Sequence, residues 1–147
     1  MSMTPDDKIA TTLDVVLYWV ATWRKDGDYL GFTEGCFDRI HAGHISLLGQ
    51  AGAGRRLVVG LNSDDSVRRL IQGESARAAA LAALAAVDLV VPFAVATPLR
   101  LIEAIRPDVL VQGANYSLDQ VGADLVRSYG GRVVLVPLEP TPSANSV

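Results

Sequence analysis

The segment 29–50 constrains the fold of this chain more than any other. Its first part, residues 29–33, is a short apolar run with the length of a strand. After residue 44, the apolar residues recur with the spacing of a helix. The loop between them, residues 34–44, contains both histidines of the chain, His41 and His44. This order of strand, loop and helix directs the N–H groups of the first helical turn toward the loop, where they can bind phosphate.

Strand and helix patterns alternate along the rest of the chain. The near-continuous apolar character of 56–62 indicates a strand buried on both faces, as in a parallel sheet. After a leading helix at 12–25, we expect strands at 29–33, 56–62, 88–93, 109–111 and 133–136, with helices that end near residues 50 and 71 and helices at 77–86, 98–106 and 117–129. This alternation predicts an α/β fold, a Rossmann-like, doubly wound, five-stranded parallel sheet. Ligands should bind beyond the C-terminal ends of its strands.

Length and composition indicate one globular domain. The 147 residues predict a single domain over 1–147, with the leading helix inside 1–28 and a Pro- and Ser-rich tail at 137–147. A net charge of −3 provides no basic surface for nucleic acid. The single cysteine, Cys36, excludes an internal disulfide, and residues 1–7 lack the apolar core of a signal peptide. We therefore expect a cytoplasmic protein in a reducing compartment.

One segment, 78–99, is long and apolar enough to suggest a membrane span. Asp88 lies inside it, however, and Pro92 and Pro98 would interrupt a helix. We interpret the segment as an alanine-rich helix followed by a short strand, and we expect no membrane contact.

Two imidazoles beside a helix N-terminus suit the chemistry of phosphate transfer. Negative charge builds on phosphate oxygens in the transition state of such a reaction, and fixed N–H donors stabilise it. Gly35 and Gly43 would let the backbone approach phosphates where a Cβ atom would collide. The simpler alternative is that His41 and His44 are surface or helix-capping residues.

Other residues of the loop also have more than one interpretation. Asp38 can orient a histidine or cap the helix, and Phe37 fits a core position better than a ligand contact. The residue types of Cys36, Asp38, His41 and His44 suit zinc, but their spacing matches no structural zinc pattern. We therefore predict no metal ligands from the protein itself.

The pattern Gly35-x-Phe37-Asp38-x-x-His41-x-Gly43-His44 resembles the HxGH signature of the nucleotidylyltransferase superfamily, in its cytidylyltransferase-like branch. Within that branch the chain is most similar to the D-glycero-β-D-manno-heptose 1-phosphate adenylyltransferase family. The resemblance implies transfer of AMP from ATP to a heptose 1-phosphate-like sugar phosphate, release of pyrophosphate, Mg²⁺ bound with the triphosphate, and a homodimer. A cytidylyltransferase that uses CTP and a glycerol-phosphate-like substrate remains an alternative.

The same resemblance assigns roles to residues along the chain. Matching segments are 62–64 and 66–70, 112–116, and 143–147, the last of which is truncated relative to the family. The resemblance implies catalytic roles for His41 and His44. It implies nucleotide contacts for Gly35, Cys36, Phe37, Asp38, Gly43, Gly113, Asn115 and Ser143, and substrate contacts for Glu34, Asn62, Asp64, Arg69, Arg77 and Gln112. For 62–64 and 143–147, the simpler alternatives are a helix cap and a frayed tail.

Four departures from the family pattern reduce positive charge around the site. Glu34 replaces an asparagine, and Gln72 and Gln112 each replace a lysine. An arginine-bearing loop is shortened to 75–78, where only Arg77 could compensate. Because contacts between cations and phosphates are strong hydrogen bonds, their loss weakens nucleotide binding. A catalytically weak or inactive nucleotide-binding relative is therefore a further alternative.

Overall fold

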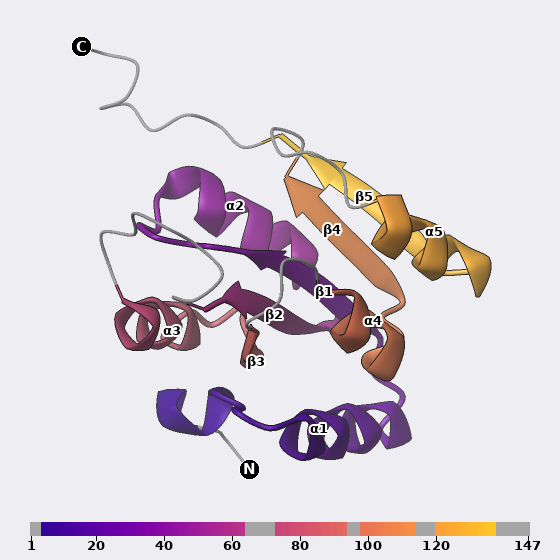
Figure 1. The fold of residues 1–147 in the computed structure, drawn as a ribbon, viewed down its shortest axis with the longest axis horizontal. Coiled ribbons are helices and arrows are strands. Elements are labelled where there is room, and N and C mark those ends of the chain that lie inside the picture. Colours follow the sequence, from indigo (N-terminus) through magenta and orange to yellow (C-terminus); the bar gives the residue numbers. More distant parts are fainter. Residues whose placement is uncertain (1–3, 64–72, 94–97, 114–119, 138–147) are drawn as a thin grey trace.

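A computed structural model describes residues 4–63, 73–93, 98–113 and 120–137. Five parallel strands form one sheet in the order β3-β2-β1-β4-β5 (Figure 1). The strands are β1 (Leu30–Gly35), β2 (Arg56–Asn62), β3 (Leu89–Phe93), β4 (Val109–Gly113) and β5 (Arg132–Val136). The helices are α1 (Leu13–Lys25), α2 (Ala42–Ala51), α3 (Glu74–Ala82), α4 (Leu99–Ile105) and α5 (Gln120–Ser128), preceded by the 3₁₀ turn η1 (Pro5–Lys8). The predicted α/β, Rossmann-like fold is confirmed.

Helices cover both faces of the sheet, and each face has its own apolar core. Alternate residues of a strand point to opposite faces. Phe32 of β1 and Leu110 of β4 pack with α1, α4 and α5, whereas Leu57 of β2 and Val111 of β4 pack with α2 and α3. Figure 1 shows α1 and α2 on opposite sides of the sheet. Burial on both faces explains why the central strands are almost entirely apolar.

Two aspartates tie the starts of neighbouring strands together. The Asp108 carboxylate, just before β4, accepts a hydrogen bond from the Leu30 N–H at 2.8 Å, and the Asp88 carboxylate, just before β3, accepts one from the Leu57 N–H at 2.8 Å. Asp88 also pairs with Arg56, at 3.3 Å. Each carboxylate thus satisfies a backbone donor that the ladder leaves open at the strand start.

The chain changes direction across the sheet between β1 and β4, where the strand order reverses. β1 pairs with β2 along its whole length, from Leu30 to Gly35. With β4 it pairs only at Gly31 and Phe32, although β1 continues to Gly35 and β4 to Gly113. The ladder therefore ends before the C-terminal ends of these two strands, which is the topological switch point where open α/β sheets bind ligands.

Several helix boundaries differ from the predicted ones. α3 begins at Glu74 after an N-cap at Gly73 and ends at Ala82, not at residues 77 and 86. Alanine favours helix throughout this stretch, but the chain has to turn after Ala82 to enter β3, so tertiary structure overrides propensity. α4 is capped by Pro98 itself, one residue later than predicted. The predicted helix at 64–71 and the start predicted at 117 lie outside the described residues.

Within this apolar segment, residues 78–93 form the end of α3, a turn and β3, as the interrupting Asp88 and Pro92 predict. Among the described residues, no helix is both long and apolar enough to cross a bilayer.

Candidate active site

Both histidines lie at the start of α2 and cap it reciprocally. His41 is the N-cap residue, and its Nδ1 accepts a hydrogen bond from the Gly43 N–H at 3.0 Å. The Nδ1 of His44 accepts one in turn from the His41 N–H at 3.4 Å. The two rings lie almost face to face, with centroids 3.9 Å apart and planes inclined by 31°. The capping alternative is confirmed, and it is compatible with the functional one, because capping uses only one nitrogen of each ring.

Capping also determines which nitrogen of each ring carries the proton. An Nδ1 that accepts a hydrogen bond has no proton, so the proton of a neutral imidazole is on Nε2. Burial, reinforced by the charge of His41, lowers the pKa of His44, and the Arg39 carbonyl opposes this in part. His44 is therefore neutral near pH 7 and presents Nε2–H as a donor. Beside it are the N–H groups of the first turn of α2, which face outward at the helix N-terminus.

The side chain of Phe37 packs against His44 and supports the position of its ring. Its ring is 5% exposed and lies edge-on to His44, with 5.3 Å between ring centroids. Its backbone is left-handed, with φ of 47°, a conformation that costs a residue with a side chain about 1–2 kcal/mol. Gly35 makes room for the ring, because a Cβ there would approach Phe37 Cε2 to 3.1 Å. Phe37 thus belongs to the core, as expected, and holds His44 in place.

A small cleft joins His44 to the ends of β1 and β4. Its lining consists of Glu34, Gly35, Cys36, Phe37, His44, Leu47 and Gly113. The structure thus brings together residues that the sequence separates by almost eighty positions. Because the β1–β4 ladder ends before this point, the cleft opens at the switch point of the sheet.

Arg77 lies in a different environment from the one expected for a substrate contact. Its side chain is 0% exposed, and its Nη1 donates to the Cys36 carbonyl at 2.8 Å and to the Asn62 carbonyl at 2.6 Å. A buried guanidinium needs such acceptors, and here they are the backbone at the ends of β1 and β2. Arg77 therefore holds the loop of residues 34–44, called the site loop below, from its buried side. The structure thus corrects the expected contact of Arg77 with substrate.

Cys36 and Asn62 meet across the same two strand ends. The Cys36 Sγ lies 4.0 Å from Asn62 Oδ1. Burial raises the pKa of the Cys36 thiol, Arg77 opposes the shift, and the charges of Glu34 and Asp38 add to it. A thiol with a raised pKa is a poor nucleophile, so Cys36 suits a binding role better than covalent chemistry.

The remaining predicted residues fall into two groups. Gly43 is buried in the first turn of α2, Asp38 is half-buried in the site loop, and Gln112 is buried at the end of β4. Asp64, Arg69, Asn115 and Ser143 lie outside the described residues, as does the departure at Gln72. Within the described part of the chain, no three His, Cys, Asp or Glu side chains gather in a way that could hold a metal.

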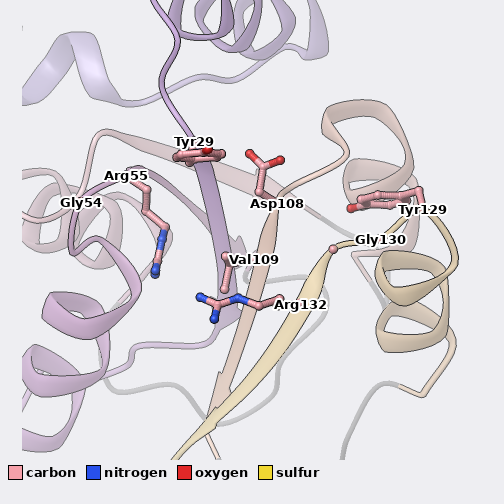
Figure 2. A pocket seen from close by; sticks show the side chains of 9 residues that line it. Tyr29, Gly54, Arg55, Asp108, Val109, Tyr129, Gly130 and Arg132 are labelled. Atoms are coloured by element: carbon pink, nitrogen blue, oxygen red, sulfur yellow. The ribbon is translucent and has the colours of Figure 1, made fainter.

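A wider hollow lies at the opposite, N-terminal edge of the sheet. Figure 2 shows Tyr29 and Asp108 at the strand starts on its rim, with Arg55 and Arg132 reaching into it. Its polar groups already serve the fold: Arg55 donates to the Ala51 carbonyl at the end of α2, and Asp108 accepts from Leu30. This hollow is remote from the histidines and joins the starts of the strands.

The fold and the site together define a class of protein. A Rossmann-like sheet, with two imidazoles and a helix N-terminus at its switch point, is the architecture of a nucleotide-binding transferase. The family model described as cytidylyltransferase-like matches residues 32–145, so the chain belongs to the cytidylyltransferase-like family.

Curated relatives agree with this assignment. The chain is 54% identical to the bifunctional protein HldE of Caulobacter sp. (strain K31), over 96% of the chain and 30% of that protein. It is 58% identical to the bifunctional protein HldE of Acidiphilium cryptum (strain JF-5), over 84% of the chain and 27% of that protein. The chain thus spans under a third of the length of these relatives.

Two solved structures share the fold at low sequence identity. A lipopolysaccharide core biosynthesis protein from Thermoplasma volcanium GSS1 matches with a TM-score of 0.64 and 24% identity, over 77% of this chain and 98% of its own. Pantoate-beta-alanine ligase from Francisella tularensis, complexed with beta-gamma ATP and beta-alanine, matches with a TM-score of 0.67 and 14% identity, over 92% of this chain and 68% of its own.

Sequence reasoning missed two features of the site. Nothing in the local pattern shows that Arg77 is buried, because its acceptors come from two other segments. Nor does it show that the two histidines cap each other, although histidines at the N-cap and N3 positions match the spacing of a capping box.

Proposed function

We propose that this chain transfers AMP from ATP to a heptose 1-phosphate-like sugar phosphate and releases pyrophosphate. The observation that carries the proposal is the pair of stacked, mutually capped imidazoles His41 and His44 at the start of α2. The choice of ATP and of a heptose phosphate is supported by the sequence resemblance described above and by the HldE relatives at 54–58% identity.

In this proposal the protein acts by binding and charge stabilisation. An oxygen of the acceptor's phosphate attacks the α-phosphorus of ATP, the bond from that phosphorus to the bridging oxygen breaks, and pyrophosphate leaves with the electron pair. The Nε2–H groups of His41 and His44 and the first amides of α2 donate to the oxygens where charge develops. No protein nucleophile is needed, which agrees with the raised pKa of the Cys36 thiol.

Mg²⁺ enters this proposal as a ligand of the triphosphate. The described residues gather no carboxylate and imidazole cluster that would hold it. When bound to the phosphates, the ion would neutralise part of their charge. That contribution suits a site with few cations, since Glu34 is acidic and Arg77 is turned into the core.

Pyrophosphate release tests the proposal. Purified protein is incubated with Mg²⁺, a heptose 1-phosphate and either ATP or CTP, with glycerol 3-phosphate as the acceptor in a parallel series. We expect release with ATP and the heptose phosphate. Release only with CTP and glycerol phosphate would replace this proposal by the cytidylyltransferase alternative.

The variant His41→Asn separates catalysis from capping. Asparagine is a good N-cap residue, so the helix start should survive, whereas the distal N–H donor is lost. We expect kcat to fall by about 10²–10³-fold, the effect of removing one fixed donor to a developing charge, with little change in melting temperature. Ser46→Ala, on the exposed side of α2, is the matched control and should leave kcat unchanged.

A non-catalytic nucleotide-binding relative is the second candidate, favoured by the burial of Arg77. It predicts that ATP binds in a calorimetric titration while no acceptor gives pyrophosphate. The homodimer implied by the resemblance is tested on the same sample by light scattering.

A further inference from the structure

The hollow at the N-terminal edge of the sheet contains two positive charges that no carboxylate of the described chain neutralises. It encloses about 380 Å³ between the loop that follows α2 and the starts of β1, β4 and β5. Figure 2 shows the side chains of Arg55 and Arg132 entering it from two sides. Neither guanidinium forms an ion pair within the described residues. A cavity of this volume is in the range of small-molecule sites.

Arg55 is held in a fixed position by the backbone around it. Its Nη1 donates to the carbonyls of Gln50 at 3.2 Å and Ala51 at 2.9 Å, at the end of α2. Its aliphatic stem passes over Gly31 of β1, where a Cβ would lie 2.9 Å from Arg55 Cδ. A guanidinium carries N–H donors on all three nitrogens, and these contacts use only Nη1. The donors on Nη2 and Nε can therefore bind a ligand without a rearrangement of the side chain.

Arg132 supplies the second guanidinium, from the start of β5. Its backbone is fixed, because the Arg132 N–H donates to the Asp108 carbonyl at 2.9 Å. Its side chain is exposed and makes no hydrogen bond within the described ranges. It extends past Val109 toward the side of the hollow where Arg55 lies (Figure 2). Two like charges that face one hollow repel each other, and an anion between them replaces this repulsion by attraction.

One carboxylate also lines the hollow, but it lies on the rim. Asp108 stands there beside Tyr29 (Figure 2), and its Oδ2 accepts the Leu30 N–H. Tyr29 is 67% exposed, so its ring offers an accessible aromatic face next to the charged interior. The hollow thus combines a cationic interior with a rim that suits an organic group, since an aromatic ring can stack and a carboxylate accepts hydrogen bonds from hydroxyls.

This distribution of charge fits a phosphate ester. Two guanidinium groups suit phosphate well, because each can donate two parallel hydrogen bonds to its oxygens. The whole chain has a net charge of −3 and no general attraction for anions, so binding here depends on the local pair. We propose that the hollow binds the phosphate group of a small phosphorylated molecule between Arg55 and Arg132. The site lies at the opposite edge of the sheet from the histidines and does not rest on the proposed function.

Chemical-shift mapping of the isotope-labelled chain tests the site, because it reports where a ligand binds. Inorganic phosphate, ribose 5-phosphate and AMP are titrated separately, with sodium chloride at matched ionic strength as the control for screening. We expect saturable shifts of the Gly54, Gly130 and Gly131 amides, which line the hollow, with each phosphate. Shifts of the Gly43 and His44 amides report binding at the start of α2, so one spectrum distinguishes the two sites.

Arg132→Gln removes one charge from the hollow without removing a contact of the described fold. We expect the dissociation constant for phosphate to rise at least about ten-fold, the effect of losing a charge-assisted hydrogen bond, and the melting temperature without ligand to stay the same. Arg127→Gln is the matched control. It removes the same charge from an exposed arginine of α5 that does not line the hollow, and it should leave the dissociation constant unchanged.

Comparison of the probes identifies the organic part of the ligand. Tighter binding of AMP than of ribose 5-phosphate, with the difference lost in Tyr29→Ser, would support the site and assign it to nucleotides that stack on Tyr29. Equal binding of both, tighter than that of inorganic phosphate, would support the site and assign it to sugar phosphates.

The proposal fails if the shifts are confined to the start of α2, if sodium chloride reproduces them, or if Arg132→Gln binds phosphate as tightly as the wild type. The test reads binding and not turnover, so it is independent of the transferase assay. A chain that shows these shifts but releases no pyrophosphate would keep this site and overturn the proposed function.

Discussion

Replacing Arg77 by methionine should destabilise the chain more than any other exchange of an arginine on a described helix. The guanidinium is 0% exposed, and its Nη1 donates to the carbonyls of Cys36 and Asn62 at 2.8 and 2.6 Å. Methionine fills much of the same space, so the packing loss is small. The two carbonyls at the strand ends, however, lose their donor in a buried setting.

The magnitude follows from the two hydrogen bonds. A hydrogen bond to a charged group contributes about 1.5–3 kcal/mol, so with two such bonds we expect the free energy of unfolding to fall by about 3–6 kcal/mol. For a chain of this size each kcal/mol lowers the melting temperature by about 3 °C, which predicts a loss of about 9–18 °C. Urea unfolding followed by circular dichroism gives the free energy, and a thermal scan gives the temperature.

Two variants make the result interpretable. Arg77→Lys keeps a donor within reach and should recover part of the loss, whereas Arg100→Met removes an exposed arginine from α4 and should change stability by less than about 0.5 kcal/mol. If Arg77→Met unfolds within about 1 kcal/mol of the wild type, the two carbonyls have other donors and the assignment of Arg77 as the organiser of the site loop is wrong.

Three further predictions concern other parts of the molecule. Gly60→Ala should cost about 1–3 kcal/mol in urea unfolding, because the new Cβ would lie 2.9 Å from Phe32 Cζ; an unchanged midpoint would mean that β2 can shift. Asp108→Ala should cost about 1–3 kcal/mol by leaving the Leu30 N–H without its acceptor, and hydrogen exchange at that amide should quicken; unchanged exchange would contradict the role. Burial lowers the pKa of His44 below its ordinary value of 6.5, so the unfolded chain binds more protons there and the free energy of unfolding falls as the pH drops below 6.5. His44→Gln should flatten that dependence between about pH 8 and about pH 5, and an unchanged slope would count against a buried neutral His44.

Much of the fold could be predicted because its signals are local. Strand β2 was predicted at 56–62 and begins and ends there, since a strand buried on both faces is apolar without interruption. The boundaries of α3 were wrong by several residues, because alanine favours helix wherever it stands and the turn into β3 is imposed by the neighbouring elements. Of the site, the motif from Gly35 to His44 was recognisable, because those residues act within one loop and one helix turn.

By itself, the sequence determined the class of fold, the order of its elements and the position of the two histidines at a helix start, because periodicity and spacing act over a few residues. Only the tertiary structure decided that Arg77 turns inward beneath the site and that Glu34 and Gly113 line the same cleft. These facts depend on strands β1, β2 and β4 lying side by side. The direction in which a side chain points and the partners it finds are set by segments far away in the chain, which no local pattern encodes.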